Sequence, residues 1–214
     1  MSVCEKIGYG FRGEELVHVS QVERGLACGC VCVACLQPLL AKKGDVKEHH
    51  FAHQHNSECL GAAETALHLL SKELFASMRS IAVPRYELHL QREVSGQLIG
   101  IRALILEGGV ARIDAARTEQ RKVGFIPDVI LQCGHKSLIV EIAVTHRVER
   151  NKLRHIRRNN EPALEIQLAP TDALLGRDDL REKLQHDLTS KTWLFHPKQR
   201  ETEREFFRKL RLAS

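Results

Sequence analysis

The sequence lacks the features of secreted, membrane-spanning and low-complexity proteins. No apolar run approaches the roughly 20 residues that cross a bilayer, and residues 1–5 do not resemble the start of a secretory signal. No segment is of low complexity, and none repeats another. The hydrophobic content of 43% and the charged content of 28% are globular values. We therefore expect a cytoplasmic chain with one sizeable domain, a small appendage and no membrane partner.

Cysteine usage indicates metal binding rather than disulfides. The chain has seven cysteines, an odd number, and we expect no secretory leader. Cys32 and Cys35 form a Cys-x2-Cys pair, and the His-x2-His pair of His50 and His53 follows after fourteen residues. This is zinc-ligand spacing, because a tight turn can direct both thiolates of a pair at one ion. We predict a zinc-ribbon-like module over residues 1–60 that holds a structural Zn²⁺.

The ligand set of this predicted zinc site is partly open. Cys32, Cys35 and His53 form its core, and either Cys59 or His50 completes the tetrahedron, so four of these five residues bind the ion. Two further cysteines precede the pair, which leaves the choice of thiols open. The alternative is a group of free buried thiols beside an incidental histidine cluster.

A predicted β-hairpin carries the main candidate for a reactive site. Residues 125–132 and 137–145 are rich in Ile and Val and surround a glycine turn, which is the pattern of a hairpin. If Gly134-His135 forms a two-residue turn, Asp128 lies opposite Glu141. Directly opposed Cβ atoms are roughly 5 Å apart, so the two carboxylates repel each other unless a cation lies between them.

Both faces of this hairpin are predicted to be covered. Asp128 shares its face with Ile130, and Glu141 shares its face with Ile139 and Ala143. A carboxylate pair in a covered sheet needs a positive partner, which favours a divalent cation. An exposed pair of surface carboxylates is the alternative. The opposite face carries Val129, Leu131, Val140, Ile142 and Val144.

Pro127-Asp128 followed by Glu141 resembles the PD-(D/E)XK nuclease superfamily. In that superfamily the Asp and Glu hold magnesium, and a lysine contacts the reacting phosphate or water. The lysine expected two residues after the Glu is Ala143 in this chain. Some members supply the lysine from the following helix, and Lys152 has the place of such a migrated residue. The pattern Glu141-Ile-Ala-Val-Thr-His146 also resembles competence-protein CoiA-like sequences, and this resemblance covers roughly residues 28–168.

The resemblance implies a fold and a cofactor. It implies an α+β (α/β) fold with a restriction-endonuclease-like core of order α-β-β-β-α-β over residues 61–170, followed by a C-terminal helical extension over residues 171–214. Asp128 and Glu141 would bind Mg²⁺ or Mn²⁺, helped by the main-chain carbonyl of Ile142, and Lys152 would stabilise charge on the phosphate or position the water.

Residues 62–78 predict the first helix of this core. Good helix formers dominate the segment, and apolar residues recur at i, i+4, i+7 and i+11. Glu64, His68 and Lys72 recur every fourth residue along the flank of that stripe. Since the superfamily often has an acidic residue here, the resemblance implies that Glu64 is a metal or water ligand. An ordinary solvated Glu64–His68 pair is the alternative.

A basic stretch follows the hairpin. Residues 147–158 contain six Lys or Arg and one acid, with apolar residues at helical spacing. The overall net charge is only +5, so this local face matters more than the total. We predict that Arg150, Arg154, Arg157 and Arg158 contact phosphates of a nucleic acid. Aromatic residues are scarce here, so base stacking is not supported, and a solvated helix is the alternative.

The remaining segments extend the predicted fold. Three alternating stretches predict an antiparallel meander, and a fourth predicts a strand parallel to the second strand of the hairpin through a crossover helix. Polar amphipathic helices are expected near the C-terminus. The three meander stretches are 84–94, 97–106 and 110–116, the parallel strand is 163–168, and the helices are 171–190 and 198–212.

These patterns together favour a magnesium-dependent DNA nuclease. Glu64, Asp128, Glu141 and Lys152 would form its catalytic centre, and DNA processing, recombination or phage-related defence would be its setting. Two alternatives from other classes stay open. One is a catalytically silent nucleic-acid-binding module, and the other is a zinc-stabilised factor that binds a protein partner. A homodimer is also compatible with the sequence.

Overall fold

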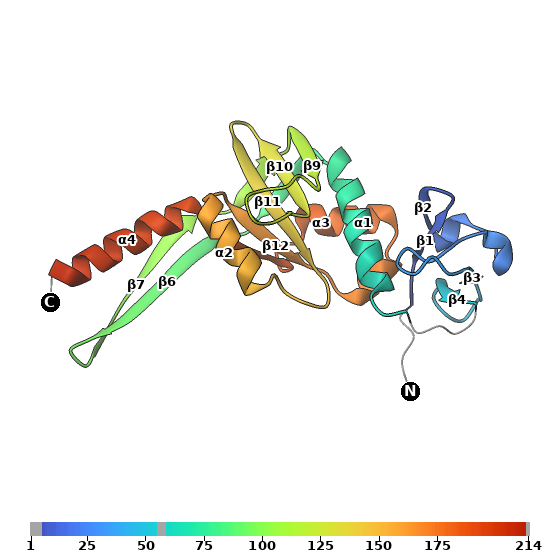
Figure 1. Ribbon diagram of the computed structural model, residues 1–214, viewed down its shortest axis with the longest axis horizontal. Coiled ribbons are helices and arrows are strands. Elements are labelled where there is room, and N and C mark those ends of the chain that lie inside the picture. Colours follow the sequence, from blue (N-terminus) through green and yellow to red (C-terminus); the bar gives the residue numbers. More distant parts are fainter. Residues whose placement is uncertain (1–5, 55–58, 213–214) are drawn as a thin grey trace. The chain divides into compact units, whose positions relative to one another are not determined.

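The computed structural model describes residues 6–54 and 59–212, and it has a mixed α+β architecture (Figure 1). The chain forms two compact units, each built from segments that are distant in the sequence. It therefore passes several times between the units, whereas the sequence analysis placed successive boundaries at residues 60 and 170. The first unit comprises residues up to Ser77, Ile142–Arg147 and Gln167–Leu184, and the second comprises Met78–Glu141, Val148–Ile166 and residues from Gln185.

Small strand pairs and one long helix build most of the first unit. Strand β1 (Tyr9–Arg12) pairs antiparallel with β2 (Glu15–His18), and β3 (Leu39–Lys42) pairs antiparallel with β4 (His50–His53). Helix α1 (Ala62–Ser77) follows, and its predicted apolar stripe is buried, as the helical spacing requires. Two short 3₁₀ helices, η1 (Val19–Gln21) and η2 (Leu26–Cys28), connect β2 to β3.

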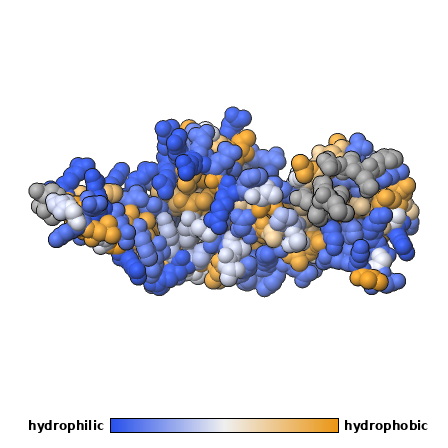
Figure 2. Space-filling model, turned by 90° about the horizontal axis from the view of Figure 1, so that it is seen from below, coloured by the Kyte–Doolittle hydropathy of each residue, from blue (hydrophilic) through white to orange (hydrophobic). Residues whose placement is uncertain are grey.

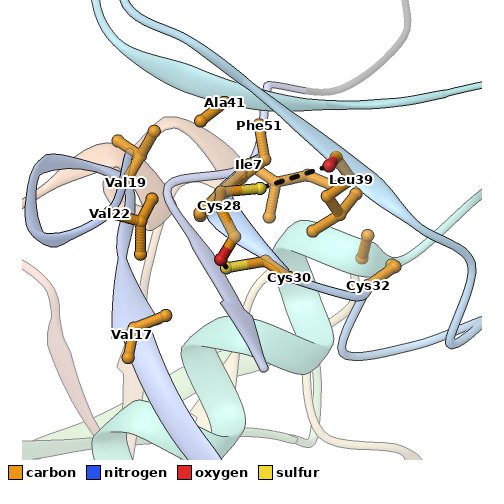
Figure 3. Packing of buried hydrophobic residues seen from close by; sticks show 11 residues of the cluster. Ile7, Val17, Val19, Val22, Cys28, Cys30, Cys32, Leu39, Ala41 and Phe51 are labelled. Carbon is orange, nitrogen blue, oxygen red and sulfur yellow. Dashed lines mark hydrogen bonds between the residues drawn. The ribbon is translucent and has the colours of Figure 1, made fainter. Parts of the chain in front are cut away.

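A hydrophobic cluster holds these N-terminal strands together (Figure 3). Phe51 from β4 and Leu39 from β3 are almost fully buried in it. Three cysteines belong to the cluster, Cys28, Cys30 and Cys32. Cys28 Sγ donates to the Leu39 carbonyl and Cys30 Sγ donates to the Cys28 carbonyl, both at 3.3 Å. Each of these two thiols is satisfied by the main chain, so both act as small apolar core residues.

A five-stranded sheet of order β13-β12-β11-β10-β9 lies mainly in the second unit. Strands β9, β10 and β11 run antiparallel, and so do β12 and β13. Helix α2 (Arg150–Asn159) connects β11 to β12 as the predicted crossover, and its Ile156 is buried against the sheet. The strands are β9 (Ala115–Thr118), β10 (Val129–Cys133), β11 (Lys136–Ala143), β12 (Ala163–Gln167) and β13 (Lys191–Phe195).

The predicted register of the β10–β11 hairpin is confirmed. Val129 pairs with Val140 and Cys133 pairs with Lys136, which leaves Gly134-His135 as the two-residue turn. Gly134 has a φ of 59° at the first central position, where a type II′ turn requires glycine. Continuing the register by one residue beyond Val129 places Asp128 opposite Glu141.

The parallel pairing of β11 with β12 is also as predicted. Ile139 N donates to the Pro162 carbonyl at 2.9 Å, and Leu168 N donates to the Ala143 carbonyl at 2.8 Å. These bonds advance in the same direction along both strands, as in a parallel ladder. Their spacing makes residue 165 the direct neighbour of Glu141 on the adjacent strand.

The predicted meander is right for two strands and wrong for the third. Strands β6 (Tyr86–Val94) and β7 (Gln97–Leu106) form a long hairpin, and helix α4 packs along it (Figure 1). Ser95 and Gly96 have φ values of 51° and 78°, as a type I′ turn requires at both central positions.

The stretch 110–116 does not join this hairpin. Its first part belongs to β8 (Gly109–Arg112), which pairs with β5 (Ser80–Val83), and its last part begins β9 of the large sheet. The chain changes partners at two consecutive residues: Ile113 N donates to Arg79 O, whereas Asp114 N donates to Gln132 O, both at 2.8 Å. Long-range pairing thus divides a segment whose alternation had predicted one strand.

The C-terminal region is not purely helical, contrary to the sequence analysis. The expected helix over residues 171–190 is replaced by a 3₁₀ helix, η3 (Pro170–Leu174), and a shorter helix, α3 (Arg177–His186). The chain then adds β13, a Trp- and Phe-containing edge strand beside β12. The expected helix over residues 198–212 is present as α4 (Pro197–Leu212).

The succession α1, β9, β10, β11, α2, β12 contains the expected order α-β-β-β-α-β, but β5 to β8 intervene between α1 and β9. Among the described residues, no helix has both the length and the apolar character to cross a membrane. Hydrophilic side chains predominate on the face of the molecule that Figure 2 shows.

Burial of Lys191 at the start of β13 generates a prediction about stability. Its ammonium is 5% exposed and donates to the carbonyls of Ala82 and Gln185 at 2.9 and 3.0 Å. Burial lowers the pKa of Lys191 to about 8, and the charge of Asp187 opposes this shift. Between about pH 8 and pH 10.5 the unfolded chain therefore binds one proton more at this residue, so the stability contributed by Lys191 rises with pH in this window.

Lys191→Met keeps the length of the side chain and removes this titration. We expect the difference in free energy of unfolding between wild type and Lys191→Met to grow in favour of wild type from pH 8 to pH 10. Chemical denaturation at both pH values measures it. A difference that is constant with pH would show that Lys191 titrates alike in both states.

Candidate metal centres

Four side chains from three segments of the first unit converge on one point. Cys32 and Cys35 come from the turn before β3, His53 ends β4, and Cys59 precedes α1. Their ligand atoms all lie within 4.8 Å of one another. The turn is tight: Leu36 N donates to the Cys32 carbonyl at 3.0 Å, and Ala34 N donates to Cys32 Sγ at 3.4 Å. This geometry gathers a Cys₃His set that could hold a structural zinc.

The separations within the cluster fit a tetrahedral ion. Cys32 Sγ lies 3.8 Å from Cys59 Sγ, and Cys35 Sγ lies 3.2 Å from His53 Nε2. With Zn–S bonds of about 2.3 Å and Zn–N bonds of about 2.0 Å, tetrahedral angles give about 3.8 Å between sulfurs and about 3.5 Å between sulfur and nitrogen. The observed distances are close to these values, so the ligands need only small adjustments.

The protonation of the cluster also favours a cation. Burial raises the pKa of Cys59 to about 12, and the neighbouring thiols of Cys35 and Cys32 add to the effect. Burial also raises the pKa of Cys35, but hydrogen bonds from the Gln37 main chain and the other thiols leave it lowered overall. Burial lowers the pKa of His53, which keeps its imidazole neutral as a metal ligand must be. A divalent cation would stabilise several thiolates together.

The structure selects Cys59 over His50 as the fourth ligand. His50 lies at the other end of β4, and its Nδ1 is 2.9 Å from the Glu48 carbonyl. Side chains alternate between the two faces along a strand. His50 and His53 are three residues apart, so they face opposite ways. Cys28 and Cys30 do not belong to the converging set, and their thiols donate to main-chain carbonyls instead.

The second candidate centre surrounds Glu141 in the large sheet. Glu141 is 1% exposed, and Lys152 Nζ from α2 donates to its Oε2 at 2.5 Å. The structure thus brings Lys152 into contact with Glu141, while the catalytic role of Lys152 stays a prediction. Among the described residues, the buried Glu141 Oε1 has no hydrogen-bond partner. An orphaned carboxylate oxygen in a covered sheet is costly, and it is available to a ligand.

The electrostatics of Glu141 show a deficit of positive charge. Burial raises its pKa to about 8; Lys152 opposes this rise, whereas the carboxylate of Asp128 adds to it. The charge of Lys152 thus does not fully offset the effects of burial and of Asp128 on the pKa of Glu141. Either a proton or a further cation must balance the pair, and oxygen ligands of this kind suit Mg²⁺.

Sequence reasoning gave no site role to a third carboxylate, Glu165 of β12, although Glu165-Ile-Gln-Leu168 belongs to the CoiA-like pattern. The parallel register makes it the neighbour of Glu141, and it is 3% exposed. Glu165 Oε2 accepts a hydrogen bond from Val148 N at 2.8 Å. This bond fixes the chain just before α2, so that Lys152 on the first turn of the helix reaches Glu141. The pairing of β11 with β12 was predicted, and counting its register would have found Glu165.

Glu64 belongs to the first unit, and its part in a catalytic centre stays a prediction. There its Oε2 accepts a hydrogen bond from Thr145 Oγ1 at 2.5 Å, and its Oε1 lies 3.9 Å from His68 Nε2. Thr145 Oγ1 is also 2.9 Å from His146 Nδ1. Glu64 and His68 are therefore close enough to form the pair that was the alternative. Lys72, one turn further along the helix, also takes part in an interaction.

The predicted nucleic-acid contacts on α2 are accessible. Arg150, Arg154, Arg157 and Arg158 are all exposed, while Ile156 on the opposite side packs against the sheet. The helix is therefore amphipathic in the expected sense. Its phosphate contacts stay a prediction.

The Cys₃His geometry predicts which substitutions remove zinc. Cys32→Ser should lower the zinc content from about one ion per chain to near zero and destabilise the first unit, because metal-binding free energy is folding free energy in such sites. Cys28→Ser makes the same chemical change at a buried cysteine outside the Cys₃His set and should retain zinc. His53→Asn should lose zinc, whereas His50→Asn should keep it.

Elemental analysis and thermal unfolding of the four variants measure both effects. Zinc-free wild-type protein that is well folded would contradict a structural zinc. Equal loss of zinc from Cys28→Ser and Cys32→Ser would contradict this ligand set.

The comparisons with known proteins bear on the N-terminal part of the chain. The family described as competence protein CoiA, N-terminal domain, matches residues 19–61. This segment contains all four ligands of the Cys₃His cluster. No curated protein and no solved structure matches the chain significantly. The match supports the predicted resemblance to CoiA-like proteins over this N-terminal segment.

Proposed function

We propose that the chain is a metal-dependent DNA nuclease of the PD-(D/E)XK type, with Asp128, Glu141 and Lys152 at its centre. The observation that carries this proposal is the contact between Lys152 Nζ and the buried carboxylate of Glu141. This contact supports the proposal that a lysine from the following helix serves in place of the lysine that the superfamily has at position 143. The competence-protein match at residues 19–61 is compatible with DNA as the substrate.

The residues fit a magnesium ion for electrostatic reasons. Asp128 and Glu141 offer carboxylate oxygens, Lys152 offsets only part of the rise in the pKa of Glu141, and Glu141 Oε1 has no hydrogen-bond partner among the described residues. When bound, Mg²⁺ would lower the pKa of a water molecule and neutralise charge on the attacked phosphate. Glu165, next to Glu141 in the sheet, positions the helix that carries Lys152.

Lys152 would change partners during the reaction. In the structure its ammonium donates to Glu141. For catalysis Lys152 would donate to a non-bridging oxygen of the phosphodiester, where negative charge develops as water attacks phosphorus. A preorganised donor at such a position contributes about 10²–10³ in rate. Attack breaks the P–O bond to the leaving sugar oxygen, which takes up a proton.

A catalytically silent DNA-binding module is the second candidate. The observation that favours it is again the Glu141–Lys152 ion pair, which partly satisfies the buried carboxylate without a metal. The two candidates differ in magnesium binding and in cleavage.

Substitutions at the carboxylates test the nuclease proposal. Asp128→Asn and Glu141→Gln should each abolish magnesium-dependent cleavage, because each removes a metal ligand. DNA binding should survive or tighten, since a negative charge near phosphate is lost. Linear, nicked, branched and single-stranded DNA are incubated with Mg²⁺, with Mn²⁺ and in divalent-free buffer. Strong chelators are avoided because they would strip the predicted zinc.

Lys152→Ala should slow cleavage by on the order of a hundredfold. Lys122→Ala is the matched control: it removes a lysine that pairs with Glu161 at 2.8 Å in the same unit, and it should cleave normally. Ala143→Lys in the Lys152→Ala background should restore part of the rate. Cleavage by Asp128→Asn at the wild-type rate would remove the nuclease site from this hairpin, and an inert wild type without magnesium binding would favour the silent module.

A further inference from the structure

An arginine-rich groove lies between α4 and the β6–β7 hairpin of the second unit. Its volume is about 720 Å³. Five guanidinium groups and one carboxylate, that of Glu203, line it, together with the ring of Phe207. The groove is separate from both candidate metal centres, and sequence reasoning assigned it no role. Its arginines are Arg92 from β6 and Arg200, Arg204, Arg208 and Arg211 from α4.

The spacing of the α4 arginines produces this concentration of charge. Positions 200, 204, 208 and 211 follow each other by four, four and three residues, so they share one face of the helix. Gln199, Phe206 and Leu210 are buried on the adjoining face against the hairpin. The remaining acids point elsewhere: Glu201 and Glu205 are exposed, and Glu205 pairs with Lys209 at 2.9 Å.

The positive charge of the groove is not neutralised from within. Over residues 6–54 and 59–212, none of the five arginines has a carboxylate partner at salt-bridge distance. Glu203, the acid in the groove, accepts a hydrogen bond from Gln199 Nε2 at 2.8 Å. Arg92 instead lies over the Phe207 ring, 5.7 Å from its centroid. Like charges gathered in this way repel each other, and a polyanion would relieve the repulsion.

The groove adjoins the helix that carries Lys152. Arg200 donates to the Arg157 carbonyl at the C-terminal end of α2, and its guanidinium lies 5.6 Å from the centroid of the Phe195 ring. Tyr86 donates to Gln199 Oε1 at 2.7 Å, which fixes the first turn of α4 to β6. The C-terminal end of α2 and the first turn of α4 therefore lie side by side within the second unit (Figure 1).

We propose that this arginine groove binds the sugar-phosphate backbone of duplex DNA that flanks the cleavage centre. The inference rests on the proposed nuclease function and adds the substrate class: a duplex that extends beyond the cleaved bond. Guanidinium groups suit phosphate oxygens. Single-strand binders stack successive bases on aromatic rings, whereas Phe207 is the one aromatic ring in the groove and Arg92 lies over it.

Helix dimensions give the length of the flank. The sixteen residues of α4 span about 24 Å, which equals about seven base pairs at 3.4 Å each. DNA that reaches the end of the groove must therefore continue about seven base pairs past the end of α2. A very short duplex can occupy the cleavage centre without filling the groove.

The test measures equilibrium binding of a 30-base-pair duplex in divalent-free buffer over a range of salt concentrations, so cleavage plays no part. Arg204→Gln/Arg208→Gln removes two positive charges from the groove. Lys198→Gln/Lys209→Gln removes two positive charges from the other side of α4 and is the matched control. Circular dichroism and thermal unfolding of both variants confirm that α4 remains folded.

The groove variant should flatten the slope of log affinity against log salt by roughly 0.9 for each lost contact, hence by about 1.8, and weaken binding about tenfold or more at 0.1 M salt. The control should leave the slope close to that of wild type.

Equal slopes for the groove variant and the control would overturn the proposal, since net charge alone would then explain binding. Loss of affinity for single strands but not for the duplex would overturn the choice of duplex. Failure of the nuclease proposal has a different signature: the groove variant would still lose DNA affinity while wild type cleaved nothing.

Discussion

The carboxylate of Glu141 limits how the second unit can be arranged, because it is buried in a sheet whose two faces are both covered. Glu141 is almost inaccessible, so its charge cannot be screened by water and must be balanced by neighbours. Lys152 supplies one positive charge, while Asp128 adds a second negative one. Glu165 then fixes the start of the helix that brings Lys152 into reach. The position of α2, the crossover helix between β11 and β12, therefore determines how the charge of Glu141 is balanced.

Local patterns predicted the parts of the fold that depend on local geometry. The glycine turn and the alternation on either side of it determined the register of Asp128 and Glu141, and Cys-x2-Cys with His53 gave three zinc ligands. Sequence spacing could not choose between Cys59 and His50, because the direction of each side chain depends on how β3 and β4 pair. The same limit explains the divided stretch 110–116 and the unpredicted strand β13, where distant backbone partners decide the structure.

The arginines of α4 illustrate a different limit. Their i, i+4 spacing is visible in the sequence, yet an exposed basic helix usually just faces water. Their role depends on which part of the chain faces them. The β6–β7 hairpin forms one side of the groove, and its Arg92 lies 108 positions before Arg200 in the sequence. The proposed nuclease centre shows the same dependence, since the role proposed for Lys152 comes from its contact with a strand rather than from a motif around it.

The zinc ligands also have a consequence for the order in which the chain can fold. All four lie between Cys32 and Cys59, so the ligand set is complete early in synthesis. The large sheet, in contrast, gains its edge strand only when Lys191–Phe195 has been made. A nascent chain that captures zinc can thus anchor its N-terminal strands while the apolar β10 and β11 still await their neighbours. Vectorial synthesis would separate the metal-dependent step of folding from the step that depends on sheet completion.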